Sequence, residues 1–124
     1  MNTVLVADDN EDAADSLAVL LRLEGYRVRV AYDGRTALEA LRVRPPDVAF
    51  LDIAMPGLNG YEVVQAIREE PPDAQMVLVA VTSCGSRADK EMARAAGFDH
   101  HFTKPVDPNE LLALLRAPRG SPAG

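Results

Sequence analysis

Short apolar runs alternate along this chain with stretches in which apolar residues recur every three or four positions. The apolar runs predict five strands, over residues 4–7, 27–30, 48–52, 76–81 and 100–103. The helical spacing predicts five helices, over about 11–24, 35–44, 60–70, 88–96 and 107–117. Strands that alternate with helices in this way form a parallel sheet with helices on both faces. The pattern therefore predicts an α/β protein.

The chemistry of each run predicts its place in the sheet. The runs at 4–7, 48–51 and 76–81 are wholly apolar, which indicates central strands that are buried on both faces. The run at 27–30 alternates polar and apolar residues, and the run at 100–103 is short and polar, so these two should be edge strands. This arrangement fits a doubly wound, flavodoxin-like sheet with the strand order 2-1-3-4-5.

Two of the predicted helices differ in the strength of their apolar face. The first should pack on the sheet through four residues, Ala13, Leu17, Leu20 and Leu21. The fourth has a weaker face of mostly small residues, Ala88, Met92, Ala95 and Ala96. We interpret Met55 and Met92 as packing residues, because an unbranched thioether side chain fills gaps in cores.

Length and composition indicate one ordinary globular domain. We assign residues 1–117 to this domain and residues 118–124, which are rich in Pro and Gly, to a flexible C-terminal tail or linker. The net charge of −6 argues against direct nucleic-acid binding, which needs clustered basic residues. No apolar run approaches the roughly 20 residues that span a membrane. The lone Cys84 permits no internal disulfide, so we expect a cytoplasmic protein.

Charged or hydroxyl-bearing residues, which can bind ligands or react, lie at the ends of four of the predicted strands. Asp8 and Asp9 follow the first strand, Asp52 ends the third, Thr82 follows the fourth and Lys104 follows the fifth. Parallel strands bring their carboxyl ends to one rim of the sheet, where ligands bind near the reversal of strand order. Each residue alone has a simpler interpretation. Asp8 and Asp9 could cap the first helix, and Asp52 could be a turn residue. Thr82 could bond to the backbone, and Lys104 could be a solvated charge. Their convergence on one rim favours a shared function.

Three carboxylates gathered at one rim require a positive counter-charge. Two unit charges at 4 Å interact by about 4 kcal/mol when the effective dielectric constant is near 20. Carboxylate oxygens without histidine or thiolate partners suit a hard cation, so Mg²⁺, or Mn²⁺, is the expected cofactor. A cation, an ammonium group and a hydroxyl can together hold a phosphoryl group, for which Asp52 could be the nucleophile.

These motifs resemble those of bacterial response-regulator receiver domains of the chemotaxis-Y type. The resemblance covers about residues 3–117 and rests on short motifs in a fixed order: Asp8-Asp9-Asn10, Phe50-Leu51-Asp52, Met55-Pro56-Gly57, Gly60, Val81-Thr82-Ser83 and Lys104-Pro105. It implies that Asp52 accepts a phosphoryl group from a sensor histidine kinase, a phosphotransfer protein or a small phosphodonor. Residues 97–107 are further similar to receivers found in hybrid sensor kinases.

The same resemblance implies a role for each residue around the metal. Asp9 and Asp52 would bind the ion directly, together with the backbone carbonyl of Ala54. Asp8 would act through a metal-bound water.

It also implies how the phosphoryl group is held and detected. Thr82 and Lys104 would hold its oxygens, and a cis peptide bond before Pro105 would aim the lysine. His101 occupies the position of an aromatic switch residue, which changes rotamer when the threonine hydroxyl moves toward the phosphoryl group. Tyrosine or phenylalanine is commoner at that position.

The resemblance places the output surface on the fourth helix, last strand and last helix, residues 87–117. We expect the signal to pass to a downstream protein partner or to an output domain outside this chain, and the protein to be a monomer or weak homodimer. It would not be a conventional enzyme, although it would catalyse its own phosphorylation and dephosphorylation.

Two alternatives remain open at the level of sequence. A pseudo-receiver would bind partners without phosphorylation, although such proteins usually lose an acidic residue or the lysine, and both are present here. An aspartyl-nucleophile phosphatase of the haloacid-dehalogenase type would need an acid two positions after the nucleophile, where this chain has Ala54. The chain also lacks the glycine-rich patterns of nucleotide-binding folds.

Overall fold

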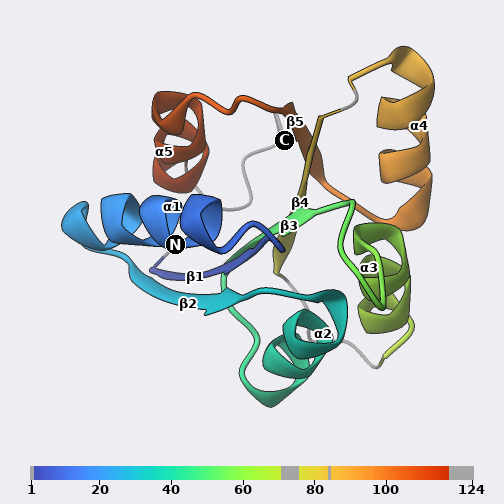
Figure 1. Cartoon of the computed structure of the whole chain (residues 1–124), viewed down its shortest axis with the longest axis horizontal. Coiled ribbons are helices and arrows are strands. Elements are labelled where there is room, and N and C mark those ends of the chain that lie inside the picture. Colours follow the sequence, from blue (N-terminus) through green and yellow to red (C-terminus); the bar gives the residue numbers. More distant parts are fainter. Residues whose placement is uncertain (1, 71–75, 84, 118–124) are drawn as a thin grey trace.

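A computed structural model of the protein describes residues 2–70, 76–83 and 85–117. Within these residues, strands and helices alternate along the chain (Figure 1). The strands are β1 (Thr3–Ala7), β2 (Arg27–Ala31), β3 (Val48–Asp52), β4 (Val77–Thr82) and β5 (His100–Thr103). The helices are α1 (Glu11–Leu23), α2 (Gly34–Val43), α3 (Gly60–Arg68), α4 (Arg87–Ala96) and α5 (Pro108–Arg116). The predicted elements are therefore confirmed to within a few residues at their ends. The predicted tail 118–124, Cys84 and residues 71–75, which follow the third helix in the sequence, lie outside the described residues.

The five strands form one sheet in the order β2-β1-β3-β4-β5, and every neighbouring pair is parallel. The predicted doubly wound fold, with β2 and β5 at the edges, is confirmed. The apolar runs explain this order, because β3 is buried along its whole length and β1 from its second residue onward. Strands without a polar face can lie only between other strands and under helices.

Two apolar cores lie on opposite faces of the sheet. One joins α1 and α5 to the face that carries Val6, Phe50 and Val79. The other joins α2, α3 and α4 to the opposite face, which carries Leu51 and Ala80 (Figure 1). Burying a side chain of this size contributes roughly 1.5–3 kcal/mol, so the two cores hold the central strands and their carboxyl ends firmly.

The apolar faces of two helices differ from the sequence prediction. In α1 the buried residues are Ala14, Ala18 and Leu21, whereas Ala13 is exposed and the predicted Leu17 and Leu20 are only half-buried. The apolar stripe of α1 is thus wider than its contact with the sheet.

The described part of the chain contains no helix with the length and hydropathy of a membrane span.

The predicted apolar face of α4 was wrong for Ala88, Met92 and Ala95, which are all exposed. Met92 is 54 % exposed, and Ala93 is the buried residue of this helix. The reason is that α4 covers the sheet beside β5, a four-residue edge strand, which offers little apolar area. Met55 does pack in the core, as predicted, and is 6 % exposed.

Candidate functional site

The carboxyl ends of the central strands bring three carboxylates together. Asp8 and Asp9 follow β1, and Asp52 is the last residue of β3, next to β1 in the sheet. One carboxylate oxygen of each residue lies within 4.8 Å of those of the other two. Asp8 and Asp52 are buried, at 8 % and 5 % exposure, whereas Asp9 is exposed. The cluster therefore has a buried floor and an open side.

Lys104 joins this cluster from the far end of the sheet. Its Nζ donates hydrogen bonds to Asp8 Oδ2 at 3.1 Å and to Asp52 Oδ2 at 3.2 Å. Its backbone N–H donates to the carbonyl of Thr82 at 2.7 Å, which ties the lysine to the end of β4. The peptide bond between Lys104 and Pro105 is cis, in agreement with the sequence analysis. The structure thus brings all four strand ends to one rim.

The helix-cap interpretation of Asp8 and Asp9 is not what the structure shows. Asn10 caps α1, and its Oδ1 accepts a hydrogen bond from the backbone N–H of Ala13 at 3.1 Å. Asp8 instead accepts from the backbone N–H of Asn10 at 2.9 Å. Within the described part of the chain, the Asp9 carboxylate forms no hydrogen bond or ion pair. With the cap supplied by Asn10, both acids are available to the rim.

The loop between β3 and α3 folds tightly around Asp52. The backbone N–H of Ala54 donates to Asp52 Oδ1 at 3.2 Å, and the N–H of Gly60 donates to the carbonyl of Ile53 at 2.9 Å. A Cβ on Gly60 would lie 2.8 Å from both the Asp52 carbonyl oxygen and Ile53 Cα. Contacts that short do not occur between such atoms, so glycine is required where α3 begins against this backbone.

The electrostatics of the rim favour a bound cation. The pKa of the Asp52 carboxyl rises from 3.8 to about 6, first because burial disfavours its charged form and then because Asp8 lies beside it, while Lys104 acts in the opposite direction. Burial acts to lower the pKa of Lys104, but its hydrogen bond to Asp8 and the charge of Asp52 raise it overall. The single ammonium group of Lys104 therefore does not neutralise the three carboxylates of the cluster.

The residues present fit a divalent cation of the Mg²⁺ or Mn²⁺ type. The donors are carboxylate oxygens that lie close enough to share one ion, and one side of the cluster is open. Hard cations prefer such oxygen donors and keep several waters or substrate oxygens among their ligands. Asp8, Asp9 and Asp52 are the side chains that would hold the ion.

The two residues predicted to form the switch lie beside the rim. Thr82 ends β4, and His101 pairs with Ala80 in the same strand register. Because side chains alternate along a strand, Ala80, Thr82 and His101 project from one face of the sheet, the face covered by α3 and α4. The His101 ring lies against α4, in a cavity that Lys90 and Ala93 also line.

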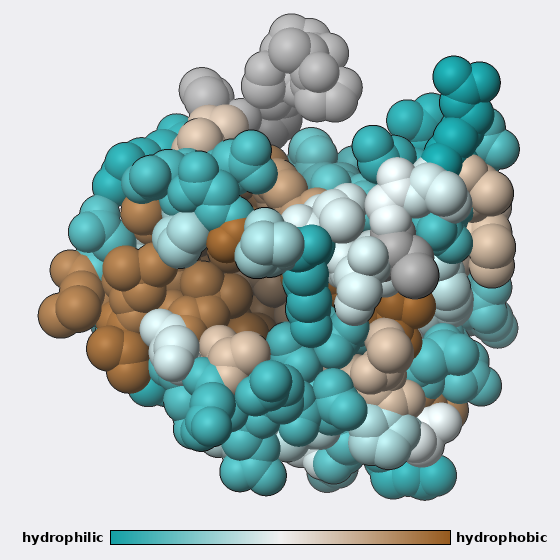
Figure 2. Space-filling view, turned by 45° about the horizontal axis from the view of Figure 1, so that its top comes forward, coloured by the Kyte–Doolittle hydropathy of each residue, from teal (hydrophilic) through white to brown (hydrophobic). Residues whose placement is uncertain are grey.

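An apolar groove next to the rim was not predicted from the sequence. It encloses about 640 Å³ between α1 and α5, and its lining includes Leu17, Leu20 and Leu111, with Asp8 and Lys104 at its border. Figure 2 shows the corresponding apolar hollow on the side of the molecule where α1 and α5 lie. Its signal in the sequence was the broad apolar stripe of α1, which exceeds what one sheet face can bury.

Comparison with known proteins agrees with this geometry. The sequence profile of the response regulator receiver domain matches residues 4–116. The chain belongs to the response regulator receiver family.

Solved receivers share the whole fold. The receiver domain of a Francisella response regulator is 27% identical, superposes with a TM-score of 0.86, and each chain is covered to 93%. The chemotaxis response regulator CheY4 of Vibrio cholerae is 31% identical with a TM-score of 0.83, and the match covers 93% of this chain and 96% of that one. A CheY-like receiver protein from Methanospirillum hungatei is 28% identical with a TM-score of 0.84, over 93% and 90% of the two chains. As a receiver, the protein is a phospho-signalling switch of two-component systems, a class that interacts with histidine kinases or phosphotransfer proteins.

Proposed function

We propose that this receiver accepts a phosphoryl group on Asp52, with Mg²⁺ or Mn²⁺ bound at Asp8, Asp9 and Asp52. The observation that carries the proposal is the placement of Lys104, whose Nζ lies within hydrogen-bond distance of both Asp8 and Asp52. An ammonium group in that position can neutralise phosphoryl oxygens as soon as they reach Asp52. The donor would be the phosphohistidine of a sensor kinase or phosphotransfer protein, or a small phosphodonor.

The reaction at Asp52 is an in-line displacement at phosphorus. A carboxylate oxygen of Asp52 attacks the phosphoryl group, the bond from phosphorus to the donor's imidazole nitrogen breaks, and that nitrogen keeps the electron pair and takes up a proton. With a pKa of about 6, Asp52 is ionised, and so nucleophilic, at neutral pH. Lys104 and the hydroxyl of Thr82 would stabilise the transferring oxygens. A bound Mg²⁺ would supply further positive charge to those oxygens.

The same residues imply that the protein is not a conventional enzyme. Asp52 is itself the group that becomes modified, and the position two residues later, Ala54, offers no acid for the turnover of external substrates. The protein would catalyse only its own phosphorylation and dephosphorylation.

The groove between α1 and α5 suits the docking of a protein donor. It is apolar and borders Asp8 and Lys104, so a helix lying in it would bring a phosphohistidine to the rim. Leu20→Arg should therefore slow phosphoryl transfer from a phosphohistidine protein while leaving phosphorylation by acetyl phosphate unchanged. Val43→Arg on α2 is the matched control, because Val43 is 75 % exposed and lies outside the groove.

The output surface would be α4, β5 and α5. Ala93 is the only residue of α4 buried in the core, and His101 and Phe102 of β5 are only partly buried. Because α4 and β5 are held by so few apolar contacts, they rearrange at low cost, as a switch region requires, whereas α5 is anchored by three buried leucines. A downstream protein or an output domain outside this chain would read that rearrangement.

Intact mass spectrometry after incubation with acetyl phosphate tests the proposal. The wild type should gain the mass of one phosphoryl group when Mg²⁺ is present and little in EDTA, and Asp52→Asn should gain none. Asp12→Asn, an exposed acid on α1, is the control and should behave as the wild type. A wild type that gains no mass would instead support a pseudo-receiver, which binds partners without phosphorylation.

A further inference from the structure

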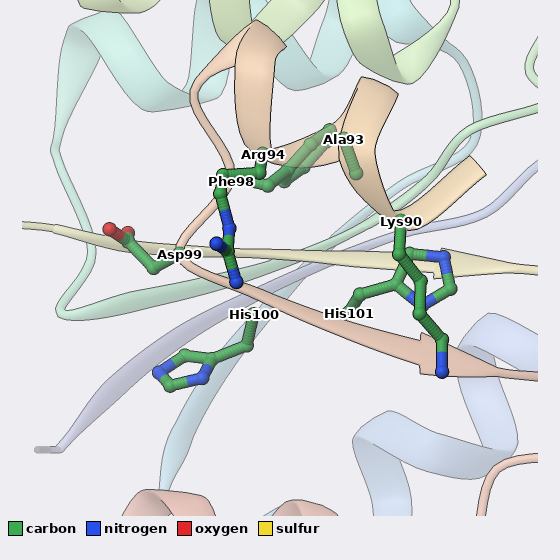
Figure 3. A pocket seen from close by; sticks show the side chains of 7 residues that line it. All are labelled: Lys90, Ala93, Arg94, Phe98, Asp99, His100 and His101. Atoms are coloured by element: carbon green, nitrogen blue, oxygen red, sulfur yellow. The ribbon is translucent and has the colours of Figure 1, made fainter. Parts of the chain in front are cut away.

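The imidazole ring of His101 lies in an unusual environment for a polar group. It lines a cavity of about 130 Å³ between α4 and β5, together with Lys90, Ala93 and Phe98. Figure 3 shows the ring beside the side chain of Lys90, whereas His100 points away from α4. Both ring nitrogens of His101 are buried, and neither has a hydrogen-bond partner among residues 2–70, 76–83 and 85–117. A neutral imidazole carries one donor and one acceptor, so both are left unsatisfied here.

The charges around the ring favour its neutral form. On α4, Lys90 faces the ring with a positive charge, and the opposing Asp89 is engaged at the helix start, where its carboxylate accepts hydrogen bonds from Ser86. Arg94 of α4 lines the same cavity. The pKa of His101 is lowered, first by burial and then by Lys90, while Asp89 acts in the opposite direction.

The strands packed beside the ring offer no free carboxylate to pair with an added proton. The residues of β4 from Val77 to Val81 are apolar, and Thr82 carries no charge. Asp99, the acid that precedes β5, already accepts from Arg68 and from the backbone N–H of Leu78 at 2.8 Å each. On β5 the other ionisable side chain is His100, and Lys104 follows the strand. A protonated His101 would therefore be a buried cation beside other cations.

We propose that His101 couples the phosphorylation switch to pH, because its ring can occupy the buried position under α4 only as a neutral imidazole. Proton uptake then favours the alternative position, in which the ring faces solvent. The inference rests on the proposed function and adds a second input, proton concentration, to the same switch.

The direction of the coupling combines the sheet geometry with the switch movement that the resemblance to receivers implies. Thr82 and His101 project from the same face of neighbouring strands. If the Thr82 hydroxyl moves toward a phosphoryl group on Asp52, as the receiver family implies, it leaves more room on the α4 side for the His101 ring, which already lies there in this structure. Phosphorylation then stabilises the buried ring and protonation stabilises the exposed ring, so acid opposes the phosphorylated conformation. By linkage, phosphorylation must lower the pKa of His101 by the same free energy.

The direct test is an NMR titration of the imidazole signals with and without Mg²⁺ and beryllofluoride, a phosphoryl mimic. The chain has two histidines, and His100→Gln assigns the signals. We expect the pKa of His101 to lie below 6.5 and to fall further when beryllofluoride is bound. A His101 pKa at or above 6.5, or one that beryllofluoride leaves unchanged, would overturn the inference.

Two pairs of variants isolate the cause. Lys90→Gln should raise the pKa of His101, because the charge of Lys90 lowers this pKa. Arg94→Gln should change the pKa less, because Arg94 is not among the causes of the shift. Beryllofluoride affinity should also fall with acid more steeply in the wild type than in His101→Phe. The affinity of the wild type divided by that of His101→Phe should be constant above pH 7. In acid this ratio should decrease, by up to tenfold for each unit by which beryllofluoride lowers the pKa of His101.

The ratio cancels other titrating groups at the rim, Asp52 included, since both proteins share them. A ratio that stays constant from pH 8 to pH 5.5 would overturn the inference while leaving the proposed function intact. A wild type that fails to bind beryllofluoride at any pH would overturn the proposed function itself, and this inference with it.

Discussion

The carboxylate of Asp52 should destabilise the metal-free protein at neutral pH, and Asp52→Asn should therefore raise its stability. Folding buries this group beside Asp8, and the two effects raise its pKa from 3.8 to about 6 despite the nearby ammonium of Lys104. Between these two values the native state holds more protons than the unfolded state. The free energy of unfolding must then fall as the pH rises from about 4 to about 6.

The size of the effect follows from the same two values. Each pH unit of this shift corresponds to about 1.4 kcal/mol, so the wild type loses about 3 kcal/mol by pH 7 relative to a protein whose residue 52 stays neutral. Asparagine has the shape of the protonated acid and cannot ionise. Asp52→Asn should accordingly match the wild type near pH 4 and exceed it by about 3 kcal/mol at pH 7 and above.

Urea denaturation in EDTA, followed by circular dichroism at several pH values between 4 and 8, measures this difference. Asp12→Asn is the control, because it also removes one carboxylate but from an exposed position on α1, outside the cluster of Asp8, Asp9 and Asp52. Equal free energies of unfolding for Asp52→Asn and the wild type at pH 7, or a difference that shrinks as the pH rises, would refute the electrostatic reasoning.

Three further changes probe the rim. Lys104→Met removes the only cation that contacts the carboxylates within the described residues, so it should destabilise the metal-free protein by about 1–3 kcal/mol at pH 7, measured by urea denaturation. It should also slow acetyl phosphate labelling. Gly60→Ala should displace the loop that follows Asp52, and calorimetry should show weaker Mg²⁺ binding than in the wild type. Asp9→Asn should weaken Mg²⁺ binding by roughly tenfold or more, because it removes a charged oxygen donor, while thermal unfolding in EDTA stays close to that of the wild type. If Gly60→Ala and Asp9→Asn both left the Mg²⁺ affinity unchanged, the proposed metal position would be excluded.

Much of the fold was predictable because burial on both sides leaves a strong mark on sequence. The apolar runs that became β1, β3 and β4 differ from the alternating β2 and the short, polar β5, and this difference separates the central strands from the edge strands. The topology then dictated which strand ends meet. Asp52 and Lys104 are 52 positions apart, yet they form an ion pair because a parallel sheet aligns its carboxyl ends.

What could not be predicted depends on how the helices lie on the sheet. The spacing of Ala13, Leu17 and Leu20 indicates an apolar face but not how much of it the sheet covers, and the uncovered part became the wall of a groove. Met92 has the hydropathy of a core residue, but α4 lies beside a short edge strand and leaves it exposed. The unsatisfied nitrogens of His101 arise from contacts between two elements, which no local pattern records.

The central claim is that Asp52 receives the phosphoryl group, and chemical mapping of the phosphorylated residue tests it most directly. Borohydride reduces an aspartyl phosphate to homoserine, which peptide mass spectrometry locates in the sequence. After treatment with acetyl phosphate and Mg²⁺, we predict homoserine at position 52 and at no other aspartate. Homoserine at another position such as 8 or 9, or its absence from a protein that has gained the mass of a phosphoryl group, would contradict the account.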